Sequence, residues 1–149
     1  MVEHAKQVRL GDQLDEATTM GPLVSAEQQQ RVQRYIEIGM DEATLAAQGA
    51  PPSDERLAGG YWVPPTIFAD ATNDVTIARE EIFGPVMTVI PFGDLEEVVR
   101  MSNDNEYGLA AAVWTRDITK ALKTARALRV GVVWINDTQP APTEAPWGG

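Results

Sequence analysis

The sequence has 149 residues, and its 22 acidic side chains outnumber its 12 basic ones, which gives a formal net charge of −10. This charge excludes nucleic acid as a partner, since nucleic-acid-binding proteins need a basic surface, and it opposes binding to an anionic membrane. The chain has no cysteine and a single histidine, His4, so we expect no disulfide, no thiol catalysis, no metal site and no catalytic triad.

Apolar residues, 44% of the chain, fall in short periodic runs that cannot cross a bilayer, and residues 1–6 lack the long apolar core of a secretory signal. We therefore expect one globular domain in the cytoplasm. A helix is predicted over Met1–Leu10. A second begins at Ser25, which with Gln28 forms a capping box, and runs to about Gln48. Its apolar face comprises Val32, Tyr35, Ile36, Gly39, Ala43 and Ala46.

An unusual stretch lies at the centre of the chain, where Glu80 and Glu81 precede Ile82-Phe83-Gly84-Pro85 and an apolar strand over 86–92. Two interpretations are open. In the first, a helix end carries two solvated glutamates and Phe83 belongs to the core. In the second, the stretch lies at the mouth of a buried strand, where α/β folds bind ligands. A carboxylate there accepts hydrogen bonds from vicinal hydroxyls, as in ribose recognition, and an aromatic ring covers a flat ligand ring.

The second half of the chain alternates strands and helices. From Val86 the predicted order is strand, helix, strand, helix and strand, with Asp94 and Asp117 as helix caps and the last strand over Val132–Asn136. Two consecutive crossover units predict an α/β fold with a parallel sheet in a three-layer αβα-like arrangement. The loop that leaves the last strand, 137–149, then lies where such folds bind ligands.

Five segments in this order resemble the aldehyde dehydrogenase superfamily. They are Gly21–Ser25, Gly59–Phe68, Glu80–Pro85, Tyr107–Thr115 and the Trp134–Gly149 tail. The resemblance covers essentially the whole chain. The tail, with its Trp-Ile-Asn and Ala-Pro-Trp-Gly-Gly stretches, is most similar to the betaine-aldehyde and amino-aldehyde branch.

The resemblance implies a cofactor site and a substrate site. Glu81 is expected to bind the nicotinamide ribose of NAD or NADP, and Phe83 to pack beside the nicotinamide, while Glu80 stays solvated or salt-bridged. Asn136 is expected to support local geometry. The substrate is an aldehyde such as betaine aldehyde or an amino-aldehyde. The residues expected to line its tunnel are Asp137, Thr138, Gln139, Ala141 and Trp147. Trp147 is either one wall of a cation–π cage or a hydrophobic anchor for the loop.

The family's reaction uses a cysteine thiolate that attacks the aldehyde, transfer of a hydride to NAD(P)+ and hydrolysis by a glutamate-activated water. Residues 1–149 lack that cysteine, so we expect a partial catalytic domain without the cofactor-binding half, the nucleophile loop or the final assembly strand, inactive alone. The parent oxidoreductase is expected to be a homodimer or homotetramer. The alternative is a non-catalytic paralogue, or a partner-binding module, with the same fold.

Overall fold

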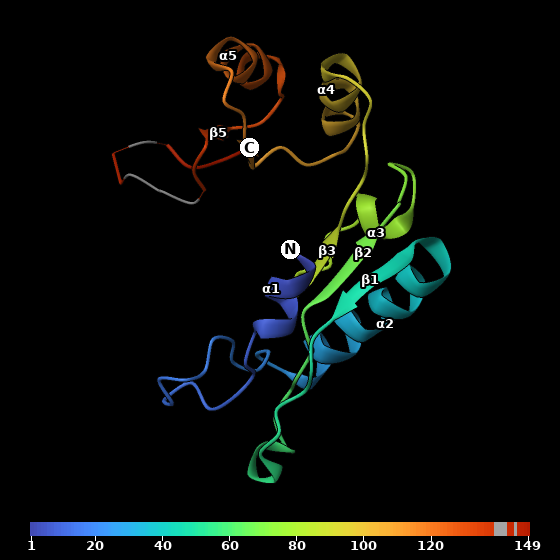
Figure 1. Cartoon of the computed structure of the whole chain (residues 1–149), viewed down its shortest axis with the longest axis vertical. Coiled ribbons are helices and arrows are strands. Elements are labelled where there is room, and N and C mark those ends of the chain that lie inside the picture. The colour runs from blue at the N-terminus through green and yellow to red at the C-terminus, as the bar shows by residue number, and fades with distance from the viewer. Residues whose placement is uncertain (139–142, 145) are drawn as a thin grey trace. The chain divides into compact units, whose positions relative to one another are not determined.

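A computed structural model of the protein describes residues 1–138, 143–144 and 146–149 (Figure 1). The chain forms two compact units, Met1–Pro91 and Phe92–Gly149. The first unit contains α1 (Val2–Gln7), α2 (Ala26–Glu42), β1 (Thr44–Gln48), η1 (Glu55–Leu57), β2 (Thr66–Ala69), α3 (Thr76–Arg79) and β3 (Val86–Thr88). The second contains α4 (Leu95–Asn103), β4 (Ala110–Val113), α5 (Ile118–Ala127) and β5 (Val132–Ile135). No helix in the described ranges has the length and apolar character needed to cross a bilayer.

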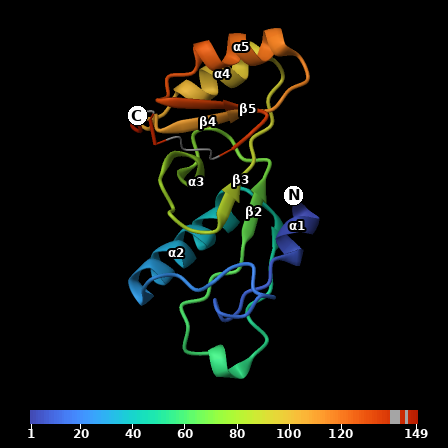
Figure 2. The same ribbon diagram turned by 90° about the vertical axis from the view of Figure 1, so that its left-hand side faces the viewer.

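The first unit is a small sheet with a helix on each face. Its strand order is β1-β2-β3, with β1 antiparallel and β3 parallel to β2. Successive side chains of a strand point to opposite faces. Accordingly, Ile67 of β2 packs with Ala5 of α1, whereas Phe68 packs with Val32 and Tyr35 of α2. Figure 2 shows α1 and α2 on either side of β2. This layering and the parallel pairing confirm the predicted α/β class.

The predicted helix from Ser25 to about Gln48 is too long. The Ser25 hydroxyl accepts a hydrogen bond from the Gln28 amide at 3.2 Å, which confirms the cap, but the helix ends at Glu42. Thr44–Gln48 instead forms β1, paired with β2. The alanines of this segment fit a helical face as well as a strand. Pairing with β2 decides between them, because tertiary contacts override weak local propensity.

The strand predicted over 86–92 is also corrected. Only Val86–Thr88 is a strand, and it is not buried on both faces, because Met87 is 46% exposed. Phe92, at the end of the predicted strand, is 58% exposed. The parallel neighbour of β3 is β2, whereas β4 and β5 pair with each other in a separate sheet. The expectation of one sheet through all three strands of the second half is therefore wrong.

The second unit is one crossover unit with an additional helix. β4 and β5 are parallel, with α5 between them in the chain, and Figure 2 shows α4 and α5 on the same side of this pair. Both predicted caps are confirmed. The Asp94 carboxylate accepts from the Glu97 amide at 2.9 Å, and the Asp117 carboxylate accepts from the Thr119 amide at 2.9 Å. Local side-chain chemistry therefore fixes where both helices begin.

Candidate functional site

The stretch between α3 and β3 has an unusual backbone conformation. The chain is extended at Glu80, and Phe83 has a positive φ of 54° while 74% of its surface is exposed. A left-handed conformation is rare for a bulky side chain, and such strain is typical of functional positions. The next residue must be glycine, because a Cβ on Gly84 would lie 2.5 Å from Cγ2 of the fully buried Val32. Phe83 is therefore held outward over a tightly packed core.

Three side chains along α2 bind this stretch. The Gln28 amide donates to the carbonyl oxygen of Phe83 at 2.8 Å, and more weakly to that of Ile82 at 3.4 Å. The Arg31 guanidinium donates to the carbonyl oxygen of Glu81 at 2.8 Å. The Tyr35 hydroxyl donates to a carboxylate oxygen of Glu80 at 2.6 Å. The bonds from Gln28 and Arg31 satisfy backbone carbonyls of an irregular turn, and the bond from Tyr35 holds a side chain. No local sequence signal indicates them, because they join residues far apart in the chain.

Glu80 is therefore not simply solvated or salt-bridged, as the sequence suggested. Its carboxylate is exposed but accepts the hydroxyl of Tyr35, which is only 6% exposed. The hydrogen bond to Glu80, then burial, then the negative charge of Glu80 raise the pKa of Tyr35 above its usual value. The phenol therefore remains a protonated donor throughout the neutral range.

Glu42, at the last turn of α2, supplies the cap that α3 lacks in its own sequence. Its carboxylate accepts from the Thr76 hydroxyl at 2.6 Å and from the Ile77 amide at 3.2 Å, whereas Val75, at the N-cap position, makes no side-chain cap bond. Burial alone would raise the pKa of Glu42, but the hydrogen bonds from Thr76 and Ile77 outweigh it and lower this pKa below its ordinary value. Both ends of the segment that carries Glu81 are thus bound to α2.

Replacing Glu42 with glutamine is expected to destabilise the first unit by about 1 kcal/mol at neutral pH, the usual cost of a lost cap. Because folding lowers the pKa of Glu42, its carboxylate contributes its full stabilisation at any pH above 4.5, the ordinary pKa of a glutamate. The stabilisation is lost as the pH falls through the folded value. Urea unfolding measures the check: the difference in the free energy of unfolding between wild type and Glu42→Gln should become smaller below about pH 4.5. A difference that does not change with pH would contradict the capping role of Glu42. The matched control is Glu37→Gln, because Glu37 lies on the exposed side of α2.

Glu81 differs from its neighbours because its carboxylate remains available. The residue is exposed, and in the described part of the chain no side chain or amide hydrogen-bonds its carboxylate. Glu81 and Phe83 line one hollow of about 390 Å³. The other lining residues are Ile77, Ala78, Glu80, Ile82, Gly84, Val86, Thr88 and Ile90. A free carboxylate acceptor beside an exposed aromatic ring suits a ligand that combines a diol with a flat ring.

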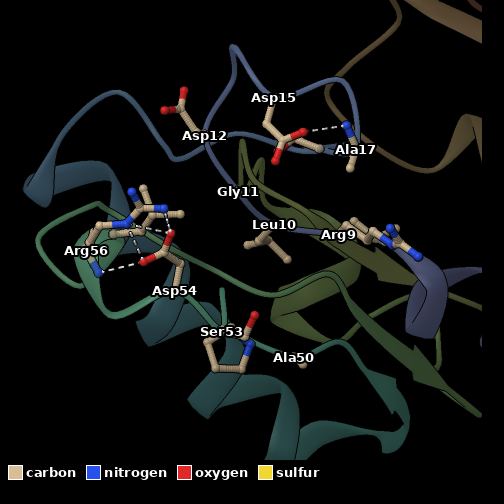
Figure 3. Close-up of a pocket in the computed structure, with 14 residues that line it drawn as sticks. Arg9, Leu10, Gly11, Asp12, Asp15, Ala17, Ala50, Ser53, Asp54 and Arg56 are labelled. Carbon is tan, nitrogen blue, oxygen red and sulfur yellow. Dashed lines mark hydrogen bonds and ion pairs between the residues drawn. The ribbon is translucent and has the colours of Figure 1, made fainter.

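A larger hollow, of about 800 Å³, lies elsewhere in the first unit, between the loops at 9–18 and 50–57 (Figure 3). Its acidic groups already have partners. Asp54 forms an ion pair with Arg56 at 2.6 Å, and Asp15 accepts from the Ala17 amide at 2.9 Å. The exposed ion pair contributes little to stability. Because these carboxylates are already bound to groups of their own loops, we favour the smaller hollow as the functional one.

The predicted substrate residues belong to the second unit. Gln139 and Ala141 lie outside the described residues. Asp137 and Thr138 follow β5 and are exposed, and the Thr138 amide donates to the Asp137 carboxylate at 2.7 Å. Trp147 is 55% exposed, and its ring centroid lies 6.0 Å from that of Trp134, with 37° between the planes. This pairing suits both roles predicted for Trp147, cation–π wall and hydrophobic anchor, because a ring that packs against Trp134 still has a face exposed for a ligand.

Asn136 joins the ends of β4 and β5. Its side-chain oxygen accepts from the Thr115 amide at 2.8 Å, and its side-chain nitrogen donates to the Thr115 carbonyl oxygen at 2.9 Å. It has a positive φ of 54°, a conformation that asparagine tolerates better than most residues. The loop that begins at Asp137 therefore starts from a fixed point, in agreement with the supporting role expected for Asn136.

Comparison with known proteins places this geometry in a family. The whole chain, residues 1–149, matches the model of the aldehyde dehydrogenase family. The chain belongs to the aldehyde dehydrogenase family. Its likeness to other members extends through both units. It is 47% identical over 150 residues to a betaine aldehyde dehydrogenase of Bacillus subtilis (strain 168), and 53% identical over 145 residues to an aldehyde dehydrogenase of Monascus ruber.

Solved structures of this family have the same fold. A betaine aldehyde dehydrogenase of Staphylococcus aureus, crystallised in complex with NAD+, superposes with a TM-score of 0.93 at 38% identity over 99% of this chain. An aldehyde dehydrogenase of Bacillus cereus superposes with a TM-score of 0.91 at 48% identity, again over 99% of this chain. The chain spans 31% of the length of the Bacillus subtilis relative and 29% of the Staphylococcus aureus structure. It thus corresponds to less than a third of an aldehyde dehydrogenase of that size.

Proposed function

We propose that these residues supply the nicotinamide-ribose contact of an NAD(P)+-dependent aldehyde dehydrogenase. The whole enzyme oxidises an aldehyde to its carboxylate, and its nucleophile comes from outside residues 1–149, since these contain no cysteine. On this proposal, the 149 residues alone do not catalyse the reaction. The single observation that carries the proposal is the free Glu81 carboxylate, beside an exposed Phe83, on a turn that is otherwise held by hydrogen bonds.

The residues of the hollow fit a nicotinamide riboside. The Glu81 carboxylate accepts hydrogen bonds from both ribose hydroxyls, and charge-assisted bonds of this kind are the stronger ones. The left-handed backbone at Phe83 presents its ring, 74% exposed, to the flat face of a heterocycle. The bound nicotinamide supplies the hydride acceptor. The contribution of this chain is orientation, because hydride transfer requires the ring to be held close to the aldehyde carbon.

The substrate that we propose is an aldehyde with a cationic group, such as betaine aldehyde or an amino-aldehyde. Support comes from the second unit, where Trp147 and Trp134 form an aromatic pair and Trp147 keeps an exposed face. Aromatic faces attract ammonium groups through their quadrupole. The relatives named betaine aldehyde dehydrogenase agree with this substrate class.

A chimera tests the proposed function. Residues 1–149 replace the matching 31% of the Bacillus subtilis betaine aldehyde dehydrogenase, and reduction of NAD+ is measured with betaine aldehyde. We expect turnover, with the KM for NAD+ raised about tenfold by Glu81→Ala, because one to two charged hydrogen bonds are lost. Glu81→Gln keeps one hydrogen-bond acceptor, so its KM for NAD+ is expected to lie between those of Glu81→Ala and the unmodified chimera.

The matched control is Glu37→Gln, which removes an exposed carboxylate from α2 that makes no contact with the motif. It is expected to leave the KM for NAD+ unchanged. A folded chimera without turnover would contradict the proposed function and favour a partner-binding module. A chimera that turns over equally well with and without the Glu81 carboxylate would contradict only the role of Glu81.

A further inference from the structure

We propose that the hydrogen bond between Tyr35 and Glu80 positions the neighbouring Glu81, so that Tyr35 and Glu80 are positioning residues for the cofactor. This inference rests on the proposed function, because it concerns how the same carboxylate is aimed. Neither residue belongs to the pair predicted to bind the cofactor, and the sequence alone assigned no such role to either.

The first argument is the register between α2 and the motif. Gln28, Arg31 and Tyr35 lie three and four residues apart, which places them on one face of the helix. Their partners run in the opposite chain direction, namely Phe83, Glu81 and Glu80. The bonds from Gln28 and Arg31 go to backbone carbonyls, whereas the bond from Tyr35 goes to a side chain of the motif. Among these bonds from α2, the one from Tyr35 is the one that fixes the direction in which a side chain of the motif points.

The second argument is the alternation of side chains along an extended chain. Glu80 has φ −107° and ψ 148°, an extended conformation, in which consecutive side chains point to opposite sides. Because Glu80 is bound to α2 through Tyr35, its successor is directed away from the helix. If Glu80 were released, rotation about this backbone would move both carboxylates together. The Tyr35 bond therefore selects the orientation in which the Glu81 carboxylate stays available.

The third argument is that Tyr35 itself is well anchored. It is 6% exposed and belongs to the core cluster with Val32, Phe68 and Ile82. The Arg31 guanidinium lies 5.9 Å from the centroid of the Tyr35 ring and also binds the Glu81 carbonyl oxygen. A catalytic or binding group is held well only when the groups behind it are themselves fixed. Tyr35 meets this requirement, because both its ring and its hydroxyl have defined partners.

The test uses the chimera described above, with variants on each side of the bond. Tyr35→Phe and Glu80→Ala are each expected to raise the KM for NAD+ about three- to tenfold, with the KM for the aldehyde unchanged. The double variant is expected to be no worse than either single one, because both remove the same bond. Glu80→Gln keeps a carbonyl acceptor for the Tyr35 hydroxyl, so its KM for NAD+ should lie within about twofold of that of the unmodified chimera. Glu80 is exposed, so its variants leave the core intact.

Tyr61→Phe is the control for loss of a phenol hydroxyl, since Tyr61 is 39% exposed and its hydroxyl binds no described residue. A purely structural role for Tyr35 would reduce the melting temperature and the active fraction but not the KM for NAD+, and this result would overturn the inference. Equal effects of Glu80→Gln and Glu80→Ala would overturn it as well. A folded chimera without any turnover would instead overturn the proposed function itself.

A measurement on the 149-residue chain tests the bond without any cofactor. Tyrosinate absorbance is followed during alkaline titration, and the chain has only three tyrosines. Tyr35→Phe identifies the part of the absorbance change that belongs to Tyr35, and Glu80→Ala should lower the pH at which that part appears, because the hydrogen bond to Glu80 raises the pKa of Tyr35. If Glu80→Ala leaves the titration unchanged, the hydrogen bond is absent and the inference is wrong.

Discussion

Phe68→Ala is expected to destabilise the first unit by about 3–5 kcal/mol, the usual cost of removing a buried phenylalanine. Phe68 is completely buried at the centre of the cluster on the α2 side of the sheet. Its ring lies so close to α2 that a Cβ on Gly39 would come within 2.6 Å of it. The backbone around the ring therefore cannot easily move in to fill the cavity, and the decrease in the free energy of unfolding should lie in the upper part of that range.

The measurement is urea unfolding, followed by hydrogen exchange of the β2 amides, which reports on the first unit alone. Phe83→Ala is the matched control, because it makes the same chemical change at a site that is 74% exposed. We expect that control to change the free energy of unfolding by less than about 0.5 kcal/mol. Similar losses for the two variants would show that Phe68 is not at the centre of this core.

Asn136→Ala is expected to destabilise the second unit by about 2 kcal/mol. The substitution removes both hydrogen bonds to Thr115 and places alanine at a φ of 54°. Each exposed hydrogen bond contributes about 0.5–1 kcal/mol, and the left-handed conformation costs a residue with a Cβ about 1 kcal/mol. Exchange of the β4 and β5 amides measures the change, because Asn136 joins the ends of these two strands.

Two further substitutions at this position separate the contributions. Asn136→Gly loses the same hydrogen bonds but has no strain, so it should be about 1 kcal/mol less destabilising than alanine. Asn136→Asp keeps the acceptor for the Thr115 amide but places a carboxylate against the Thr115 carbonyl oxygen, and it should also destabilise the unit. If glycine were no better than alanine, the backbone at residue 136 would not be left-handed in solution.

The sequence predicts best what local chemistry decides. Ser25, Asp94 and Asp117 begin helices in the structure as predicted, because a cap depends only on the three residues that follow it. The α/β class also follows from the alternation of elements. The end of α2 was misplaced because Thr44–Gln48 has no strong preference of its own and becomes a strand only beside β2.

The candidate site was predictable only in part. The sequence drew attention to Glu81 and Phe83 through an unusual motif and a family resemblance, and the structure places both on one hollow. The roles of Gln28, Arg31 and Tyr35 toward that motif were not foreseen, because residues on one helix face carry no mark of the distant segment that they bind. Tyr35 was predicted only as an apolar face residue, although its hydroxyl makes the shortest of these bonds to the motif.

The bonds from α2 to the motif also have a consequence for the order of folding. They join residues that are 45 to 55 positions apart in the chain, and closing a loop of that length costs conformational entropy before any contact repays it. An excised peptide that spans residues 78–86 is therefore expected to sample many conformations, with Phe83 rarely left-handed. During synthesis, α2 leaves the ribosome long before its partners do, so the turn that carries Glu81 and Phe83 acquires its shape late, when the two segments meet.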